Sequence, residues 1–434
     1  MTREAPSPAS PSTDPVTRCF PWVAGVVLAL SLFKGLRMPN LWSATHYTFN
    51  YSQGFIRRGL IGEIARRLLG DRAYNYNLFV LGAIIVFALM LGIFVWFIRR
   101  TLRAQGATPD TGLRLAILAF VASPGITFFA HIIGYFDDLG LLALLGLILY
   151  SARARWRYLI FYLSALLGVF LAFVHEGMVI MFLPTIFFML LCYLVRHLAQ
   201  AEVGRGTRWS LYVHTALATL AGIEASSIIS RVGSRDSATI SALQASIGRV
   251  ANFSLRGDGF EALYRPVHDN LFTLMPGHWR QPDHMATLLR GFVGIAPGML
   301  FLIYYGLRTI VRWNAGWRVK FLLSASYVVA VLAPLTLNFV GWDSNRWNAI
   351  SMITAVCCIG IMRLHFAYAA SETQIQRWSL PPWALTAGVC AVATGLATTN
   401  DLFDGYTVQW FPFGHHLDSI KELFRSHFAW RPPG

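Results

Sequence analysis

Long apolar runs are the feature that most constrains this chain. Leu78–Ile98 contains no charged residue over roughly 20 positions, the length that a helix needs to cross a bilayer. Apolar residues make up 55% of the 434 residues and charged residues only 13%, a composition unlike that of soluble domains. Backbone polar groups in lipid must be satisfied within the segment. The predicted fold class is therefore all-α: a polytopic transmembrane helical bundle.

The pattern predicts about eleven spans, each an apolar run bounded by polar or basic residues. They are Phe20–Leu36, Leu78–Ile98, Leu115–Ala130, Leu139–Ala152, Tyr158–Val174, Met178–Val195, Tyr212–Ser230, Gly291–Leu307, Phe321–Val340, Asn348–Met362 and Pro382–Thr398. The five cysteines lie in or beside these runs without disulfide or zinc spacing, which indicates packing residues.

The basic residues set the orientation. With the amino terminus inside, the inner loops hold a large excess of Arg and Lys, whereas the outer side is nearly balanced. This is the positive-inside pattern, so the net charge of +15 reflects topology and predicts no nucleic-acid partner. The predicted location is a bacterial cytoplasmic membrane. The predicted regions are a disordered cytoplasmic tail (1–18), a helical domain (19–399) with outer loops 37–77 and 231–290, and an outer tail (400–434).

Polar groups then collect on the outer side. In FFAHIIGYFDDLGLL, His131, Asp137 and Asp138 lie between two apolar runs. The run Leu139–Ala152 spans roughly 21 Å as a helix, which is short of the roughly 30 Å of hydrocarbon. The helix is therefore expected to begin earlier, with both acids in its first turns. They are interpreted either as a helix cap at the surface or as an acidic pair in an outer cavity.

Two other outer turns resemble it. His175 and Glu176 form a hairpin tip, either a plain polar turn or part of a site. In GWDSNRW, Asp343 or Ser344 is expected to cap a helix, while Arg346 is the only basic residue in a short outer loop. Glu224 lies within the seventh span and is expected to face the bundle interior.

The first outer loop is unusually basic. From Phe55 to Leu69, Leu60, Ile61, Ile64 and Leu68 recur at helical spacing, which predicts an outer amphipathic helix. Arg57 falls on the same stripe and is expected to point toward the core side. Arg66 and Arg67 point elsewhere and suit anionic lipid. A planar guanidinium binds phosphate oxygens bidentately, so Arg57 is predicted to bind phosphate.

This layout resembles the GT-C glycosyltransferases, polytopic enzymes that take a sugar from a polyprenyl-phosphate carrier at the outer face. The matching features are the basic first outer loop, Asp137 and Asp138 between the third and fourth spans, and a long loop after the seventh span. That family usually has an acid early in the first outer loop, whereas this loop offers only Glu63 and Asp71. Asp137 or Asp138 is then the better candidate for the base.

The resemblance implies transfer of the sugar to a glycan, lipid or protein acceptor, a reaction that needs a base and positive charge on the leaving phosphate. The predicted roles are as follows: catalysis by Asp137, Asp138, His131, His175 and Glu176; phosphate or donor binding by Arg57, Arg58, Arg346, Tyr51 and Gln53; support by Asp343 and Glu224. Asp137, Asp138 and Glu176 are also the candidates for holding a divalent cation, Mg or Mn. The 231–290 loop is expected to form a lid on the acceptor side.

Other functions remain open at this level. An O-antigen-type polymerase or ligase uses the same donor chemistry and also relies on arginines and a large outer loop. A transporter would use intramembrane acids and histidines to couple protons, although here the polar groups gather at one face and not at the midplane. A purely structural or assembly protein would need neither the arginine nor the acid pair.

Overall fold

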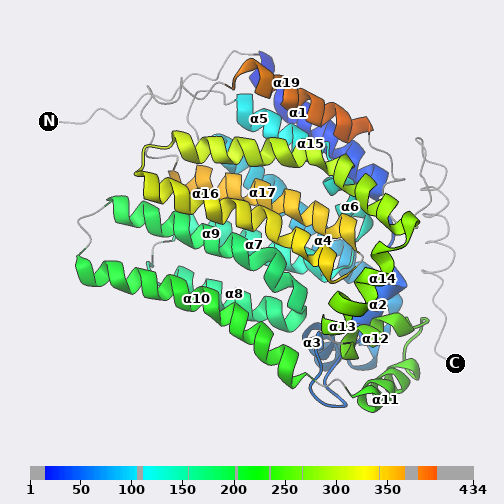
Figure 1. Cartoon of the computed structure of the whole chain (residues 1–434). Coiled ribbons are helices and arrows are strands. Elements are labelled where there is room, and N and C mark those ends of the chain that lie inside the picture. Colours follow the sequence, from blue (N-terminus) through cyan, green and yellow to red (C-terminus); the bar gives the residue numbers. More distant parts are fainter. Residues whose placement is uncertain are drawn as a thin grey trace.

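The computed structural model describes residues 15–104, 111–154, 156–200, 204–233, 236–265, 267–341, 343–366 and 380–397. Within these ranges every regular element is helical (Figure 1), which confirms the all-α polytopic bundle. The predicted tail lies outside these ranges except for its last four residues, which are helical because α1 begins at Pro15. The predicted outer tail, 400–434, also lies outside them.

Helices coincide with all the predicted apolar runs. They are α1 (Pro15–Gly35), α4 (Tyr76–Arg103), α5 (Thr111–Val121) with α6 (Pro124–His131), α7 (Phe136–Ser151), α8 (Leu159–Val174), α9 (Glu176–Gln200), α10 (Arg205–Val232), α15 (Pro282–Arg312), α16 (Trp317–Leu332) with η3 (Ala333–Phe339), α17 (Ser344–Phe366) and α19 (Pro382–Ala397). Within the described residues, 6 helices are long and apolar enough to cross a membrane, or 7 if the bent pair α5 and α6 is one span. The count of about eleven spans stays a prediction.

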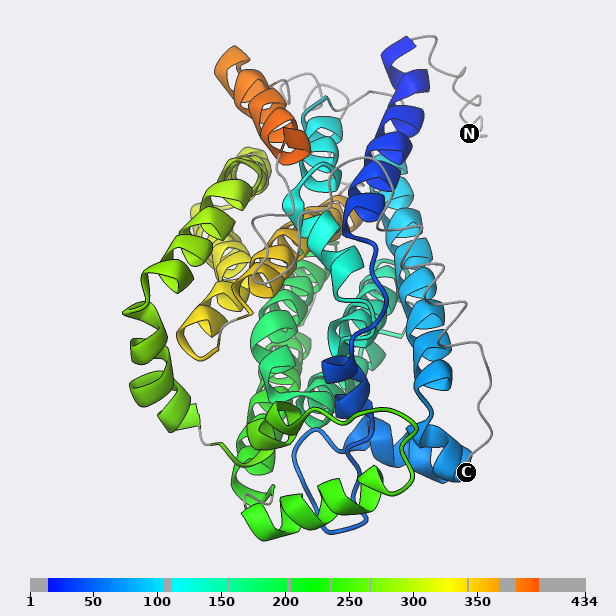
Figure 2. The same cartoon turned by 90° about the vertical axis from the view of Figure 1, so that its right-hand side faces the viewer.

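The two predicted outer loops fold against each other. The first forms α2 (Leu41–Tyr47), α3 (Leu60–Leu69) and η1 (Gly70–Tyr74). The second forms α11 (Ser237–Gly248), α12 (Gly257–Tyr264), α13 (Val267–Asp269), η2 (Asn270–Leu274) and α14 (Met275–Trp279). In both views α3, α11 and α12 lie together, away from α19 (Figures 1 and 2). Phe49 and Ile56 from the first loop share a small core with Leu243 and Phe260 from the second.

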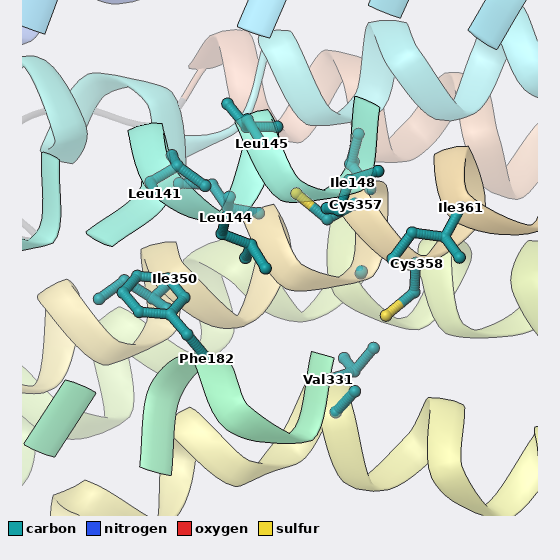
Figure 3. Close-up of a cluster of buried hydrophobic side chains, with 14 of the residues drawn as sticks. Leu141, Leu144, Leu145, Ile148, Phe182, Val331, Ile350, Cys357, Cys358 and Ile361 are labelled. Carbon is teal, nitrogen blue, oxygen red and sulfur yellow. The ribbon is translucent and has the colours of Figure 1, made fainter. Parts of the chain in front are cut away.

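Helix α17 is the centre of the bundle. Nearly all of its residues are buried, and it contacts α4, α5, α6, α9, α15 and α16. Figure 3 shows how Ile350, Cys357 and Cys358 of α17 lie among side chains of α7, α9 and α16. The three buried cysteines, Cys192, Cys357 and Cys358, carry free thiols, in agreement with the prediction that they are packing residues. A rigid α17 therefore fixes the position of Arg346 in its first turn.

Two sequence predictions about helix faces are wrong. The amphipathic helix begins at Leu60 and not at Phe55, so Arg57 precedes it. Ile64 and Leu68 on the predicted stripe are 44% and 77% exposed, whereas Glu63 is buried. Glu224 is exposed on α10 and does not face the bundle interior. The reason is that α10 packs on α8 through Gly222 and Gly168, and a residue two positions beyond Gly222 points to the opposite side.

The packing of α1 on α6 leads to a stability prediction. A Cβ atom on Gly35 would lie only 1.7 Å from the carbonyl oxygen of Thr127, so Gly35→Ala must push the two helices apart. We expect a loss of about 1–3 kcal/mol in the free energy of unfolding, measured by thermal or denaturant unfolding in detergent. Gly25→Ala on the same helix is the control, because a Cβ there has no atom within 4 Å. Equal stability of the two variants would contradict the prediction.

Candidate functional site

A buried ion pair joins α7 to α17. Nε of Arg346 lies 2.5 Å from Oδ2 of Asp137, and Nη2 lies 2.8 Å from Oδ1. Both side chains are at most 5% exposed. Asp343, half-buried at the start of α17, accepts a third hydrogen bond from Nη1 at 3.1 Å. The α7 helix begins at Phe136, so Asp137 and Asp138 lie in its first turn, as the short apolar run predicted.

A second ion pair joins the loop between α2 and α3, part of the predicted first outer loop, to α9. Arg58 donates from Nε and Nη2 to the two carboxylate oxygens of Glu176, at 3.1 and 2.6 Å, and Nη1 of Arg57 lies 3.4 Å from Oε1. Two guanidinium groups thus meet one carboxylate. Arg58 has a φ of +61°, a left-handed conformation that is unfavourable for a side chain of this kind and is kept only where the surroundings enforce it.

The other donors of Arg57 are engaged by α12. Nε donates to the carbonyl oxygen of Leu263 at 3.0 Å, and Nη2 reaches the carbonyl oxygens of Leu263, Ala262 and Arg265. Arg57 is 1% exposed. Its side chain points toward the core side, as predicted. Its guanidinium caps the carboxyl end of α12 and so connects the two predicted outer loops. Of the two neighbouring arginines, Arg58 has the more accessible side chain, at 12% against 2%.

A small pocket opens beside these pairs. It is lined by Trp42, Ser43, His46, Tyr47, Gly134, Tyr135, Phe136, His175 and Arg346. Trp42 and Tyr135 stack with ring centroids 5.2 Å apart. The guanidinium of Arg346 lies over the Tyr135 ring at 5.1 Å. The pocket therefore combines flat apolar surfaces with one cation.

His46 is the polar group in this pocket that sequence reasoning missed. It is 2% exposed, and its Nε2 has no hydrogen-bond partner in the described part of the chain. Burial lowers the pKa of His46 well below its ordinary value, and the charges of Arg58, His175 and Arg346 lower it further. The imidazole is therefore neutral at neutral pH and can accept a proton. Its only sequence signal is its place in the predicted first outer loop, ten residues after the end of the apolar run Phe20–Leu36.

The predicted acids, Asp137 and Asp138, are not part of the pocket lining. Asp138 is 1% exposed; its Oδ2 accepts a hydrogen bond from the N–H of Gly134 at 3.3 Å, while Oδ1 has no partner among the described residues. Neither Asp137 nor Asp138 is among the residues that line the pocket. Asp137 instead binds Arg346, which does line the pocket.

The remaining predicted residues are dispersed. His175 lines the pocket, with Nδ1 accepting the N–H of Gly177 at 3.0 Å. His131 lies on the other side of the turn, 2.9 Å from Arg37. Tyr51 contacts Glu63 through its N–H and stacks on Phe55, and Gln53 is exposed in the same turn. Glu224, on α10, belongs to a different surface.

The chain matches the family model described as "Uncharacterised membrane protein Rv1490" over residues 20–251. That is more than half of the chain. The chain belongs to this family. Neither the curated proteins nor the solved structures give a match. The matched region contains Trp42, His46, Asp137 and Glu176, while Arg346 comes from the part beyond it. The family description adds membrane residence and no activity.

The predicted divalent-cation site at Asp137, Asp138 and Glu176 stays a prediction. Both carboxylate oxygens of Asp137 and of Glu176 bind guanidinium groups. Oδ2 of Asp138 accepts a hydrogen bond from a backbone N–H. No group of three or more His, Cys, Asp or Glu side chains suited to a metal occurs in the described ranges.

His46 gives a pH prediction for stability. Because its folded-state pKa lies well below 6.5, only the unfolded chain takes up this proton as the pH falls below 6.5, so stability is lost in that direction. We expect a contribution of up to about 1.4 kcal/mol per pH unit. His46→Asn should flatten the pH dependence of the unfolding free energy between pH 6.5 and 5. His268→Asn, whose side chain is 75% exposed, should leave that slope intact; an unchanged slope in His46→Asn would refute the assignment.

Proposed function

We propose that the protein is a membrane glycosyltransferase that transfers a sugar from a polyprenyl-phosphate donor to a glycan, lipid or protein acceptor at the outer face. The observation that carries this proposal is the pocket in which a buried guanidinium, a neutral imidazole and stacked aromatic rings meet. Aromatic faces bind the apolar faces of sugar rings through dispersion and burial of apolar area. The guanidinium of Arg346 supplies charge for a phosphate next to that ring.

The arginines fit a leaving phosphate. In the proposed reaction the acceptor oxygen forms a bond to the anomeric carbon, and the bond from that carbon to the phosphate oxygen breaks. The electron pair of the broken bond leaves with the lipid phosphate. Arg346 and Arg58 stabilise this charge, because guanidinium groups already held by Asp137 and Glu176 need not reorganise during the reaction.

The proton balance assigns a role to His46. The acceptor hydroxyl loses its proton as it attacks, and the unpartnered Nε2 of His46 takes it up. His175 lies beside it and lines the same pocket. The sequence-based assignment of the base to Asp137 or Asp138 is less favourable, since neither acid is among the residues that line the pocket and both oxygens of Asp137 bind Arg346. We therefore propose His46 as the catalytic base, with Asp137 as the residue that positions Arg346.

The first outer loop provides a surface for the lipid chain of the donor. Ile64, Leu68 and Leu69 of α3 are 44%, 77% and 48% exposed, and Arg66 and Arg67 both bind Glu63 beside them. The hydrogen bonds from these arginines hold the pKa of Glu63 at about 2, so the group stays ionised. An amphipathic helix of this kind lies in the interface of a bilayer, and it would hold a lipid-linked substrate at the level of the pocket.

A donor-binding experiment tests the proposal. Purified protein in lipid nanodiscs is incubated with polyprenyl-phosphate-linked sugars and a mixture of membrane acceptors, and the release of polyprenyl phosphate is followed by mass spectrometry. Arg58→Gln should weaken donor binding about tenfold or more, because the variant loses a pair of charge-assisted hydrogen bonds. Arg256→Gln is the matched control, because Arg256 forms an exposed pair with Asp258 at the same end.

The outcomes separate the possible functions. Transfer to a single sugar acceptor supports the proposal, whereas repeated addition of linked repeat units would identify a polymerase or ligase. If the protein releases no polyprenyl phosphate from any donor and instead moves a labelled solute along a proton gradient in liposomes, the enzyme proposal is wrong. Equal donor affinity in Arg58→Gln and Arg256→Gln would remove Arg58 from the site.

A further inference from the structure

A group of basic side chains lies at the end of the bundle opposite the pocket, where α7, α9 and α17 all end. Figure 1 shows the last turn of α9 at the left and α2 and α3 at the other end. Nη1 of Arg196, on α9, donates to the carbonyl oxygen of Ala152 at 3.3 Å. Nε2 of His365, on α17, lies 3.0 Å from Oγ of Ser151. Arg196 and His365 therefore hold two consecutive residues at the carboxyl end of α7.

Two further basic residues belong to the same group. The rings of Tyr193 and His197 lie 4.3 Å apart, and the hydroxyl of Tyr193 donates to the carbonyl oxygen of Arg157 at 3.2 Å. The charges of Arg157 and Arg196 both act on His197, and that of Arg196 acts on His365. Arg157, Arg196, His197 and His365 are called the α9–α17 basic cluster below.

No carboxylate among the described residues balances this cluster. The ion pairs within these residues all lie at the pocket end, and Arg157 and Arg196 take part in none of them. Arg196 is half-buried, and its Nε is enclosed without a hydrogen-bond partner in the described ranges. The carboxyl end of α7 supplies only about half a negative charge. The cluster therefore needs a further anion.

His365 adds a hydrogen-bond acceptor to the cluster. Ser151 donates its hydroxyl proton to the carbonyl oxygen of Ile148 at 2.7 Å, so Nε2 of His365 donates to Ser151 and the lone pair of the neutral imidazole is on Nδ1. His365 is 2% exposed, and its Nδ1 has no partner in the part of the chain that the structure describes. A ligand that fits the cluster thus combines an anion with a hydrogen-bond donor.

Aromatic side chains indicate that this end lies at the membrane surface. Trp156, just before α8, is 72% exposed, and Tyr162 on α8 and Trp209 on α10 are both 63% exposed. The ring of His214 on α10 contacts the rings of both Tyr158 and Tyr162, so the two helices carry these residues at the same end. Trp and Tyr collect at the level of the lipid headgroups. The phosphate of a membrane lipid is therefore at the height of the cluster.

We propose that the α9–α17 basic cluster binds the phosphate of an anionic phospholipid whose headgroup carries hydroxyl groups, as in phosphatidylglycerol. Guanidinium groups bind phosphate oxygens through charge-assisted hydrogen bonds. A headgroup hydroxyl donates to Nδ1 of His365. A zwitterionic headgroup would instead bring another cation to a cluster without a carboxylate. The sequence assigns this end to the cytoplasmic side, where basic pockets between transmembrane helices bind lipid headgroups. The site is independent of the proposed sugar transfer.

Lipid binding in neutral detergent tests the site, because the micelle adds no surface charge. Native mass spectrometry of the full chain counts the bound molecules of phosphatidylglycerol or phosphatidylcholine as lipid is added. The natural protein should bind phosphatidylglycerol about tenfold more tightly, since two arginines favour the anion. Arg196→Gln should weaken this binding about tenfold through the loss of charge-assisted hydrogen bonds. Arg205→Gln is the matched control, because it removes an exposed arginine at the same end but outside the cluster.

Arg157→Gln keeps the test decisive if Arg196→Gln does not fold. Arg157 is exposed, and its contact with Tyr193 uses the backbone carbonyl, which the substitution leaves in place. This variant should bind phosphatidylglycerol about fivefold more weakly. Equal affinity of the natural protein for the two lipids, or an equal effect of Arg157→Gln and Arg205→Gln, would overturn the proposal. Occupation by added inorganic phosphate in place of the lipid would assign the site to free phosphate and overturn the lipid as its source.

Two further comparisons test the acceptor and the counterion. Phosphatidylmethanol has the same charge as phosphatidylglycerol but no headgroup hydroxyl, so it should bind about fivefold more weakly to the natural protein. In His365→Leu the two lipids should bind equally; a preference that persists would remove His365 from the site. Glu202→Gln changes the carboxylate nearest to Arg196 in the sequence and should leave lipid affinity unchanged. Lipid binding that appears only in Glu202→Gln would show that this carboxylate, and not a lipid, balances the cluster.

Discussion

Arg346→Gln is expected to destabilise the protein by about 3–5 kcal/mol, the usual cost of removing one partner of a buried ion pair. The cost arises because Asp137, which is 0% exposed, loses the guanidinium that compensates it in the interior. The amide of Gln can donate to only one of the two carboxylate oxygens now bound by Nε and Nη2. Denaturant unfolding in detergent, followed by tryptophan fluorescence, measures the change.

The double variant Asp137→Leu, Arg346→Met separates the stability of this pair from its function. Replacing a buried ion pair by apolar residues of similar volume is often neutral or stabilising, so we expect most of the lost stability to return. Sugar transfer should nevertheless stay absent in this variant, because the pocket then has no guanidinium. A single variant Arg346→Gln as stable as the natural protein, or a double variant with full transfer, would contradict the roles assigned to Arg346.

The arrangement of the bundle follows largely from the sequence. Hydrophobic runs fixed the positions of the long helices, and the short run Leu139–Ala152 correctly predicted that α7 begins early enough to include Asp137 and Asp138. The topology also placed Arg346 and Asp137 on the same side, although 209 residues separate them. Such predictions succeed because apolar length and charge are local properties of the chain.

The interaction partners of individual side chains and the buried faces of the helices did not follow from the sequence, because they depend on contacts between distant segments. The sequence pattern places Arg57 on a helix, but in the structure the helix begins only after Gly59, and Arg57 binds carbonyl oxygens of α12. Glu224 was expected inside because acids avoid lipid, yet the close Gly168–Gly222 approach decides which face of α10 is buried. His46 carries no motif; it becomes notable only when α2 brings it beside His175 and Arg346.

The largest expected effect on activity is that of His46→Gln. General-base catalysis contributes about 10²–10⁴ in rate, so kcat for sugar transfer should fall by roughly that factor, while the KM for the donor stays nearly constant. The reason is that Gln keeps the polar shape of the side chain but cannot take up the acceptor proton. His268→Gln on the same side of the bundle is the control, because His268 lies exposed outside the pocket.

Asp138→Asn distinguishes the two candidates for the base. Asp138 accepts a hydrogen bond from the N–H of Gly134 and is not among the residues that line the pocket. Its amide variant should therefore keep kcat within about threefold if His46 is the base, a change of less than 1 kcal/mol in the barrier. A collapse of kcat in Asp138→Asn together with normal kcat in His46→Gln would return the role to the aspartate.

The pH profile adds an independent readout: with His46 as base, the acidic limb of kcat/KM reports its free-enzyme pKa and should lie well below 6.5. In His46→Gln that limb should disappear, an effect that a purely structural histidine would not produce.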